Sequence, residues 1–263
     1  MRYLRLIFIT GLIAFLTGCG SLNGLFPDQV DQTKNWSASK FYSEAKKALG
    51  EGDYELAVQY YETLEARYPF GRFAQQAQIE TAYAYYKAAE PESSLAASDR
   101  FIKLHPRHPN IDYVYYLKGL ANFDAGKDIV STYLPQDPTQ RDPGAARQSF
   151  QDFGELLRRF PESKYAKDAR QRMIFLRNNL AAYEIHVARY YMKRKAYIAA
   201  ANRAKYVVEN FQRTTAVPNA LNVMVVAYSQ LGLKKLSGDA MRILAANYPE
   251  HPAYQKAQNN IIN

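Results

Sequence analysis

Small and large apolar residues recur at fixed distances from five turn positions along the chain. The turn positions, spaced by 37, 55, 51 and 37 residues, are Pro69, Pro106, Pro161, Gln212 and Pro249. Five positions before each turn stands a large apolar residue: Leu64, Phe101, Leu156, Val207 and Leu244. Twelve positions before stands a small one: Ala57, Ser94, Ser149, Ala200 and Ser237. Because seven residues are about two helical turns, both sites share one face of a helix that ends at the turn.

Each of these helices is preceded by a second helical segment, which makes a helix–turn–helix unit. Five units are predicted, at about 38–69, 73–106, 111–161, 168–213 and 218–250. A period in the mid-thirties with a closing proline resembles the tetratricopeptide repeat. The resemblance implies an all-α fold, a right-handed superhelix of about five helix pairs in which each repeat buries a face against the next.

The two long steps mark departures from the repeat. Residues 124–144 are rich in Pro and Asp and are predicted to form a loop inserted in the third repeat. The first helix of the fourth repeat is predicted to run from about Asp168 to Lys193 and to protrude beyond its neighbours. Between the first two helices, Gly52 in "GDYELA" is expected to adopt a left-handed conformation.

The N-terminal segment has the pattern of a secretory signal peptide. Two arginines precede an apolar run, Leu6 to Leu16, that is too short to span a bilayer. The run Leu16-Thr17-Gly18-Cys19 resembles the lipobox of bacterial lipoproteins. This resemblance implies a signal peptide at 1–18, S-diacylglycerol and N-palmitoyl groups on Cys19, and a lipidated tether at 19–37. The alternative is an inert, buried Cys19 in an ordinary signal sequence.

The lipobox also predicts where the protein is located. Two or more acyl chains anchor a protein stably to a membrane. No aspartate of the kind that often retains lipoproteins at the inner membrane follows Cys19. The expected location is therefore the periplasmic face of the outer membrane.

No motif in the sequence predicts catalysis or metal binding. His105 and His108 have a spacing found in metal sites, but a proline follows each, and no cysteine or nearby acid completes a ligand set. The chain has no Gly-rich phosphate loop and no serine or cysteine nucleophile with a credible base. We therefore predict that the protein is not an enzyme and has no metal or cofactor beyond the lipid on Cys19.

Charge is distributed unevenly along the repeats. Residues 19–110 hold 10 Lys or Arg and 12 Asp or Glu, a net charge of −2. Residues 157–213 hold 14 Lys or Arg and four acidic residues, a net charge of +10. The basic segment indicates an acidic partner, either a protein surface or anionic lipid headgroups. Nucleic acid is not expected in the periplasm, and an ordinary solvated face is the remaining alternative.

Tyrosines cluster in the first helices of the second and third repeats. They occur in "TAYAYYK" at 81–87 and in "IDYVYYLKG" at 111–119. Helical spacing places some of them in the core. The others suit a groove that holds an extended peptide, since tyrosine gives contact area with little loss of rotamer freedom.

Several exposed segments carry a more specific resemblance, to the BamD (ComL) family of outer-membrane β-barrel assembly lipoproteins. They are "RYPFGRFAQQAQ" at 67–78, "AYYKAA" at 84–89, "DRFIKLHPRHPNIDYVYYLKGL" at 99–120, "RDPGAARQSF" at 141–150, "YEIHVARYYMKRKAY" at 183–197 and "NRAKYVV" at 202–208. In this family a lipoprotein holds together a complex built around a BamA-like barrel protein that inserts other barrels into the membrane.

The resemblance implies a division of labour along the chain. The C-terminal repeats, 111–263, are expected to bind the last periplasmic POTRA domain of the barrel component, and accessory lipoproteins dock on the same scaffold. Arg203 matches the family's arginine at that contact, and its expected neighbours in it are Lys193, Arg194, Lys195 and Asn202. The N-terminal repeats, 38–110, are expected to receive unfolded outer-membrane protein clients through Tyr68, Phe70, Tyr83 and Tyr86.

Two other functions remain open from the residues alone. One is a different periplasmic tetratricopeptide adaptor lipoprotein, acting in cell-wall synthesis or envelope constriction. The other is a wall-cleaving enzyme with a helical superstructure, which would need a catalytic glutamate in a compact domain.

Overall fold

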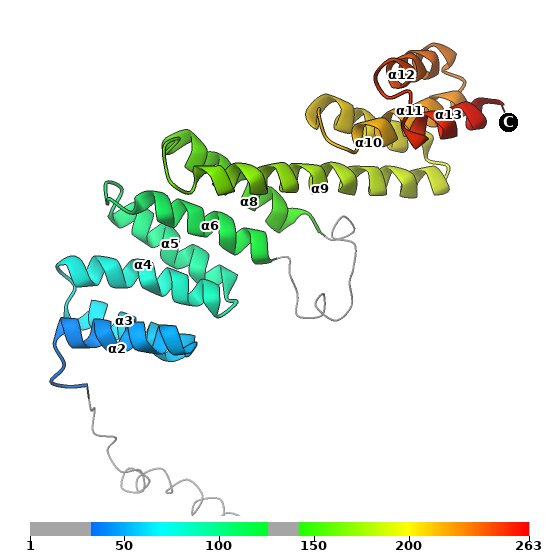
Figure 1. Cartoon of the computed structure of the whole chain (residues 1–263). Helices are drawn as coiled ribbons and strands as arrows, with labels where there is room; N and C mark the ends of the chain where they lie inside the picture. Colours follow the sequence, from blue (N-terminus) through cyan, green and yellow to red (C-terminus); the bar gives the residue numbers. More distant parts are fainter. Residues whose placement is uncertain (1–32, 126–141, 263) are drawn as a thin grey trace, which may run out of the picture.

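The computed structural model describes residues 33–125 and 142–262, and within these ranges the chain forms eleven α-helices and no β-strand. The all-α prediction is therefore confirmed. Along the chain the helices are α2 (Ala38–Glu51), α3 (Tyr54–Arg67), α4 (Arg72–Lys87), α5 (Pro91–Leu104), α6 (Ile111–Ala125), α8 (Gly144–Arg159), α9 (Ala166–Lys193), α10 (Tyr197–Asn210), α11 (Val217–Gln230), α12 (Lys234–Asn247) and α13 (Pro252–Ile262). Consecutive helices pack as pairs in an elongated stack, with α2 and α3 at one end and α12 and α13 at the other (Figure 1).

The repeat positions read from the sequence occupy equivalent places in the structure. All five large apolar residues are at most 1% exposed. The five small residues are buried as well, and the three serines among them donate a hydrogen bond from Oγ to a backbone carbonyl of the paired helix: Ser94 to Ala82, Ser149 to Gly119 and Ser237 to Val225, each at 2.9 Å. These sites therefore both permit close helix approach and bond the two helices together.

The turns between helices follow the expected local chemistry. Gly52 ends α2 with a φ of 84°, as its place in "GDYELA" predicts. The Asp53 side chain then caps α3 by accepting a hydrogen bond from the Leu56 backbone N–H at 3.1 Å. Together the two residues reverse the chain within the first helix pair.

Helices α6 and α8 approach each other closely at Gly119. A Cβ atom placed on Gly119 would lie 2.4 Å from Cε1 of Phe153, and Phe153 is fully buried. Phe153 also packs against the rings of Tyr116 and Phe123. Glycine at position 119 therefore sets the distance between the two helices of the third repeat.

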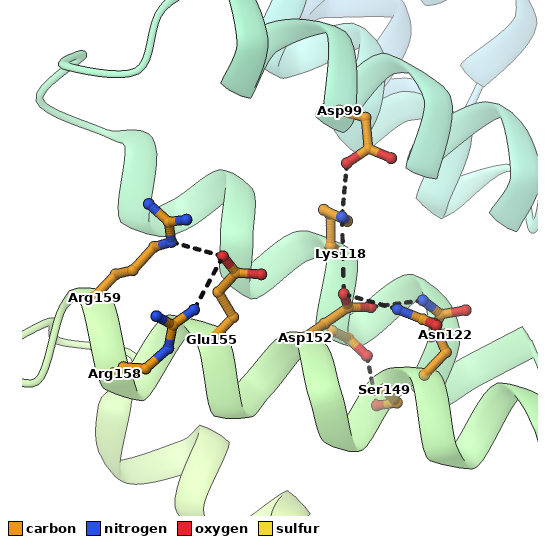
Figure 2. Close-up of polar contacts among 10 residues, drawn as sticks. Asp99, Lys118, Asn122, Ser149, Asp152, Glu155, Arg158 and Arg159 are labelled. Atoms are coloured by element: carbon orange, nitrogen blue, oxygen red, sulfur yellow. Dashed lines mark hydrogen bonds and ion pairs between the residues drawn. The ribbon is translucent and has the colours of Figure 1, made fainter.

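A polar cluster joins α5, α6 and α8, and it is buried at Asn122 on α6 and Asp152 on α8 but exposed at Asp99 on α5 (Figure 2). Lys118 Nζ lies 2.6 Å from Oδ1 of Asp99 and 3.8 Å from Oδ1 of Asp152. Asn122 Nδ2 donates to Oδ2 of Asp152 at 2.7 Å, and Gln148 Nε2 donates to Oδ1 at 3.3 Å. The side chain of Asp152 is almost fully buried, and Lys118, Asn122 and Gln148 all present donors to it, as an ionised carboxylate requires.

Helix α9 is long, as predicted, and belongs to two cores. Ala169 and Leu176, in its first half, pack with α6 and α8. Ala181, Ile185 and Ala188, in its second half, pack with α10 and α11. Different neighbours therefore cover the two halves of α9 (Figure 1). The helix does not protrude freely, and the prediction that it would protrude beyond its neighbours is wrong.

Both ends of the described stack are covered by segments outside the five predicted repeats. The sequence predicts that residues 33–36 belong to the tether, but Trp36 packs on the rings of Phe41 and Tyr60 at centroid distances of 5.2 and 5.3 Å. At the other end, α13 lies beyond the fifth predicted repeat and packs on α11, where Ala253 and Ala257 join Leu221 in one core. The repeat pattern does not extend to either segment.

The inserted segment is only partly described. The sequence predicts that Asp124, Ala125 and Gly144 lie in the loop at 124–144, but Asp124 and Ala125 are the last residues of α6, and Gly144 is the first residue of α8. Residues 126–141 of that predicted loop lie outside the described residues. The same holds for residues 1–32, which include Cys19 and most of the predicted tether.

Candidate functional site

The predicted client residues Tyr68 and Phe70 lie in the turn between α3 and α4. The Phe70 side chain is 91% exposed. It precedes Gly71, which is the N-cap residue of α4 and has a φ of 103°. Tyr68 is 37% exposed, and its hydroxyl donates a hydrogen bond to the backbone carbonyl of Trp36 at 2.7 Å. Phe70 is thus available for a partner, whereas Tyr68 also holds the N-terminal turn against the first helix pair.

Tyr83 and Tyr86 lie farther along α4 and do not join Phe70 in one site. Twelve residues of helix separate Gly71 from Tyr83, a rise of about 18 Å. Both tyrosines are half-buried, with ring centroids 6.2 Å apart, and the Tyr86 hydroxyl donates to Oδ2 of Asp124 on α6 at 2.6 Å. The four predicted client residues therefore form two clusters on the N-terminal repeats.

The second cluster continues across the third and fourth repeats. Tyr116 stacks on Tyr165 at a centroid distance of 4.7 Å, and its hydroxyl donates to Oδ2 of Asp168 at 2.6 Å. Arg172 donates to the same carboxylate oxygen at 2.6 Å and lies over the ring of Phe123. Burial and the hydrogen bond to Asp168 raise the pKa of Tyr116 to about 12.

The sequence pattern predicts this extension only in part. Tyr113, Tyr115 and Tyr116 stood out as a run, but the pattern alone did not separate core from surface. Tyr115 is buried against Phe160, whereas Tyr113 is half-buried with its ring 5.4 Å from that of Tyr165. Tyr165 carried no signal, because the two tyrosine rings that it packs against are more than 40 residues away in the sequence.

The predicted partner residues on the C-terminal side also divide into two groups. Lys193 ends α9, and Arg194 and Lys195 form the exposed turn that follows, where Lys195 has a φ of 58°. Asn202 and Arg203 are exposed on α10 and line a shallow groove of about 480 Å³. The remaining residues lining this groove are Arg147, Glu184, Tyr191, Ala199 and Tyr206.

Arg203 forms an ion pair with Glu184 that the sequence does not predict. Its Nη1 donates to Oε2 of Glu184 at 2.8 Å, and Nη2 of Arg147 lies 3.4 Å from Oε1 of the same carboxylate. The hydrogen bond to Glu184 raises the pKa of Arg203. One signal was present in the sequence, since Glu184 is one of only four acidic residues in the basic segment 157–213.

The histidines flagged in the sequence have structural contacts. The rings of His105 and His108 both pack on Phe101, at centroid distances of 5.0 and 5.2 Å. His105 Nε2 is hydrogen-bonded to Oε1 of Gln78 at 2.9 Å. Over residues 33–125 and 142–262, no group of three potential ligands is placed to hold a metal ion.

Among the helices of the described part of the chain, none is long and apolar enough to cross a membrane. This finding covers neither Cys19 nor the apolar run before it.

Comparison with known proteins gives consistent matches over most of the chain. The family model YfiO, described as an outer membrane lipoprotein, matches residues 34–244. The chain is 44% identical over 248 residues to the outer membrane protein assembly factor BamD of Neisseria meningitidis serogroup B, which covers 94% of this chain and 92% of the relative. It is 37% identical over 227 residues to the BamD of Vibrio cholerae, covering 86% of this chain and 91% of that protein.

Proposed function

Because this chain belongs to the YfiO family of outer membrane lipoproteins, we propose that it is a scaffold of the machinery that assembles β-barrel proteins into the outer membrane. The match to curated BamD proteins over almost the whole chain carries this proposal. Those relatives are named as assembly factors, in agreement with the prediction that the chain is not an enzyme. Their names also favour barrel assembly over an adaptor in cell-wall synthesis or a wall-cleaving enzyme.

Within that role, we propose that two regions of the stack bind different partners. The groove at Arg203 binds the last POTRA domain of the BamA-like barrel component, and the N-terminal repeats bind unfolded outer-membrane protein clients. The net charge of +10 in residues 157–213 supports an acidic partner at the first region. The exposed ring of Phe70 and the tyrosines of α4 support a peptide at the second. Accessory lipoproteins of the complex are further proposed partners.

The proposed attachment to the membrane is through Cys19, with S-diacylglycerol and N-palmitoyl groups, on the periplasmic face of the outer membrane. The Leu16–Cys19 motif and the family's description as lipoproteins support this proposal. Three acyl chains on one residue would give stable anchoring, which a single chain does not.

Replacing Cys19 by alanine should abolish lipidation and remove nearly all of the protein from the outer membrane fraction. The physical reason is that alanine has no thiolate to accept a lipid group. Fractionation of cells followed by mass spectrometry of the N-terminal peptide measures both effects. A Cys19→Ala chain of mature size that stays firmly in the outer membrane would contradict the proposed anchor.

Replacing Phe70 by serine should weaken crosslinking to peptides from the C-terminal strand of a barrel protein several-fold. Because the ring is almost fully exposed, the free energy of unfolding should change by about 0.5 kcal/mol or less. The matched control is Tyr68→Phe, which removes only the hydroxyl that bonds Trp36 and should affect stability more than crosslinking. Undiminished crosslinking by Phe70→Ser would remove this residue from the client site.

A further inference from the structure

Three helices from two repeats bring three charged side chains together in the C-terminal groove. Arg147 comes from α8, Glu184 from α9 and Arg203 from α10. The Glu184 side chain is 3% exposed, whereas those of Arg147 and Arg203 are 55% and 44% exposed. The carboxylate therefore lies at the base of the groove and the two guanidinium groups reach solvent.

Contact with Glu184 uses only some of the hydrogen-bond donors of each arginine. A guanidinium has five N–H donors in a fixed plane, and one nitrogen of each arginine contacts a different oxygen of Glu184. With its remaining N–H donors, each arginine can also bind a second carboxylate. Two positive charges against one negative charge also leave the cluster with a net charge of +1.

We propose that Glu184 is a positioning residue, which holds Arg147 and Arg203 as a paired receptor for one carboxylate side chain of the POTRA domain. This inference rests on the proposed function, because it takes the barrel component as the occupant of the groove. Charge complementarity supports an acidic occupant, since every residue that lines the groove except Arg147 lies in the segment 157–213, whose net charge is +10, and Arg147 adds one more positive charge. Arginine suits the role because its planar fork can bind both oxygens of a carboxylate.

The direction in which Glu184→Gln changes the affinity for the POTRA domain shows whether Glu184 positions the arginines or whether only the summed charge of the groove matters. Glu184→Gln removes a negative charge from the groove. If only the summed charge mattered, this variant would bind an acidic partner as tightly as the unaltered chain, or more tightly. If Glu184 positions the arginines, the variant should bind about tenfold more weakly despite its greater positive charge.

The experiment measures the dissociation constant of the full chain for the purified periplasmic region of the barrel component at two salt concentrations. Arg147→Gln is the second variant, and it should weaken binding about fivefold. It leaves Glu184 paired with Arg203, and so keeps the fold even if Glu184→Gln fails to fold. Arg203→Glu is less informative, because it would place a second carboxylate beside a buried one.

A matched control is Arg189→Gln, on the same helix as Glu184. Arg189 is exposed, bonds to Asn219 and does not line the groove. Its replacement also removes one positive charge, but it should change affinity less than about twofold, as for an exposed rim charge.

Failure of the proposed carboxylate receptor and failure of the proposed function would give different results. No binding by the unaltered chain would overturn the proposed function together with the receptor. Normal binding that survives both Glu184→Gln and Arg147→Gln would overturn the receptor alone. The receptor is also overturned if both variants keep their affinity for the periplasmic region but lose affinity for vesicles containing anionic phospholipid, because the groove would then bind lipid headgroups.

Discussion

Replacing Asp152 by alanine should lower the free energy of unfolding by about 3 kcal/mol, since breaking a buried ion pair typically costs 3–5 kcal/mol. The variant leaves Asn122 and Gln148 without the acceptor that each now uses, and it removes the buried counter-charge of Lys118. The lower end of the range is expected because Lys118 keeps its ion pair with Asp99 at 2.6 Å.

The charges in this cluster stabilise each other at a considerable cost in desolvation. Burial raises the pKa of Asp152, against the opposing effects of the Asn122 hydrogen bond and the Lys118 charge. Burial acts to lower the pKa of Lys118, but the hydrogen bond with Asp99 and the charge of Asp152 outweigh it and raise that pKa. Replacing the pair together, as Lys118→Met with Asp152→Leu, should therefore restore much of the lost stability.

Equilibrium unfolding by urea, followed by circular dichroism, measures these changes. Asp99→Ala is the matched control, because Asp99 bonds the same lysine from an exposed position. It should lower the free energy of unfolding by less than about 1 kcal/mol. If the Asp152 and Asp99 variants lose equal stability, burial of Asp152 does not decide the energetics of the cluster.

Replacing Gly119 by alanine should also destabilise the chain by about 3 kcal/mol, the upper end of the usual cost of overpacking a core. The added Cβ would lie 2.4 to 2.8 Å from three ring atoms of Phe153. Phe153 cannot move aside easily, because it is fully buried against Tyr116 and Phe123. Helices α6 and α8 would have to separate, which also stretches the hydrogen bond from Ser149 to Gly119.

Gly154→Ala, on α8 itself, is the control for Gly119→Ala. A Cβ at Gly154 would meet only Cε of Met173, at an ordinary contact distance of 3.6 Å. Alanine is preferred over glycine in a helix by about 1 kcal/mol, and this variant should therefore be slightly more stable. Loss of stability by both variants would show that helix packing around α8 is generally intolerant, rather than limited at Gly119.

The repeat pattern predicted the fold well because it reports packing that is local to each helix pair. Leu156 and Ser149, for example, are seven residues apart on one helix, and their burial follows from that spacing alone. The covering of the two ends was not predicted, since Trp36 and α13 belong to no repeat. Their burial depends on surfaces that the neighbouring repeats leave uncovered.

The candidate site was less predictable than the fold. The family resemblance predicts Arg203 as a partner-binding residue, but Glu184, which holds it, is 19 residues away on another helix, and Arg147 is 37 residues from Glu184. Counting charges along the segment gave the net sign of the surface and could not show which carboxylate lay beneath it. The sequence predicts Tyr68 as a client residue, and that role stays a prediction, whereas its hydrogen bond to Trp36 is visible only in the folded chain.

Because α9 is one continuous helix built into two cores, it fixes an angle as well as a distance between the two halves of the molecule. Leu176 belongs to the first core and Ala181 to the second. One residue inserted between them would turn the C-terminal repeats by about 100° around the helix axis while shifting them by only about 1.5 Å. Seven inserted residues would return nearly the same azimuth about 10 Å farther away. The length of α9 therefore sets the direction in which the N-terminal repeats face relative to the C-terminal groove.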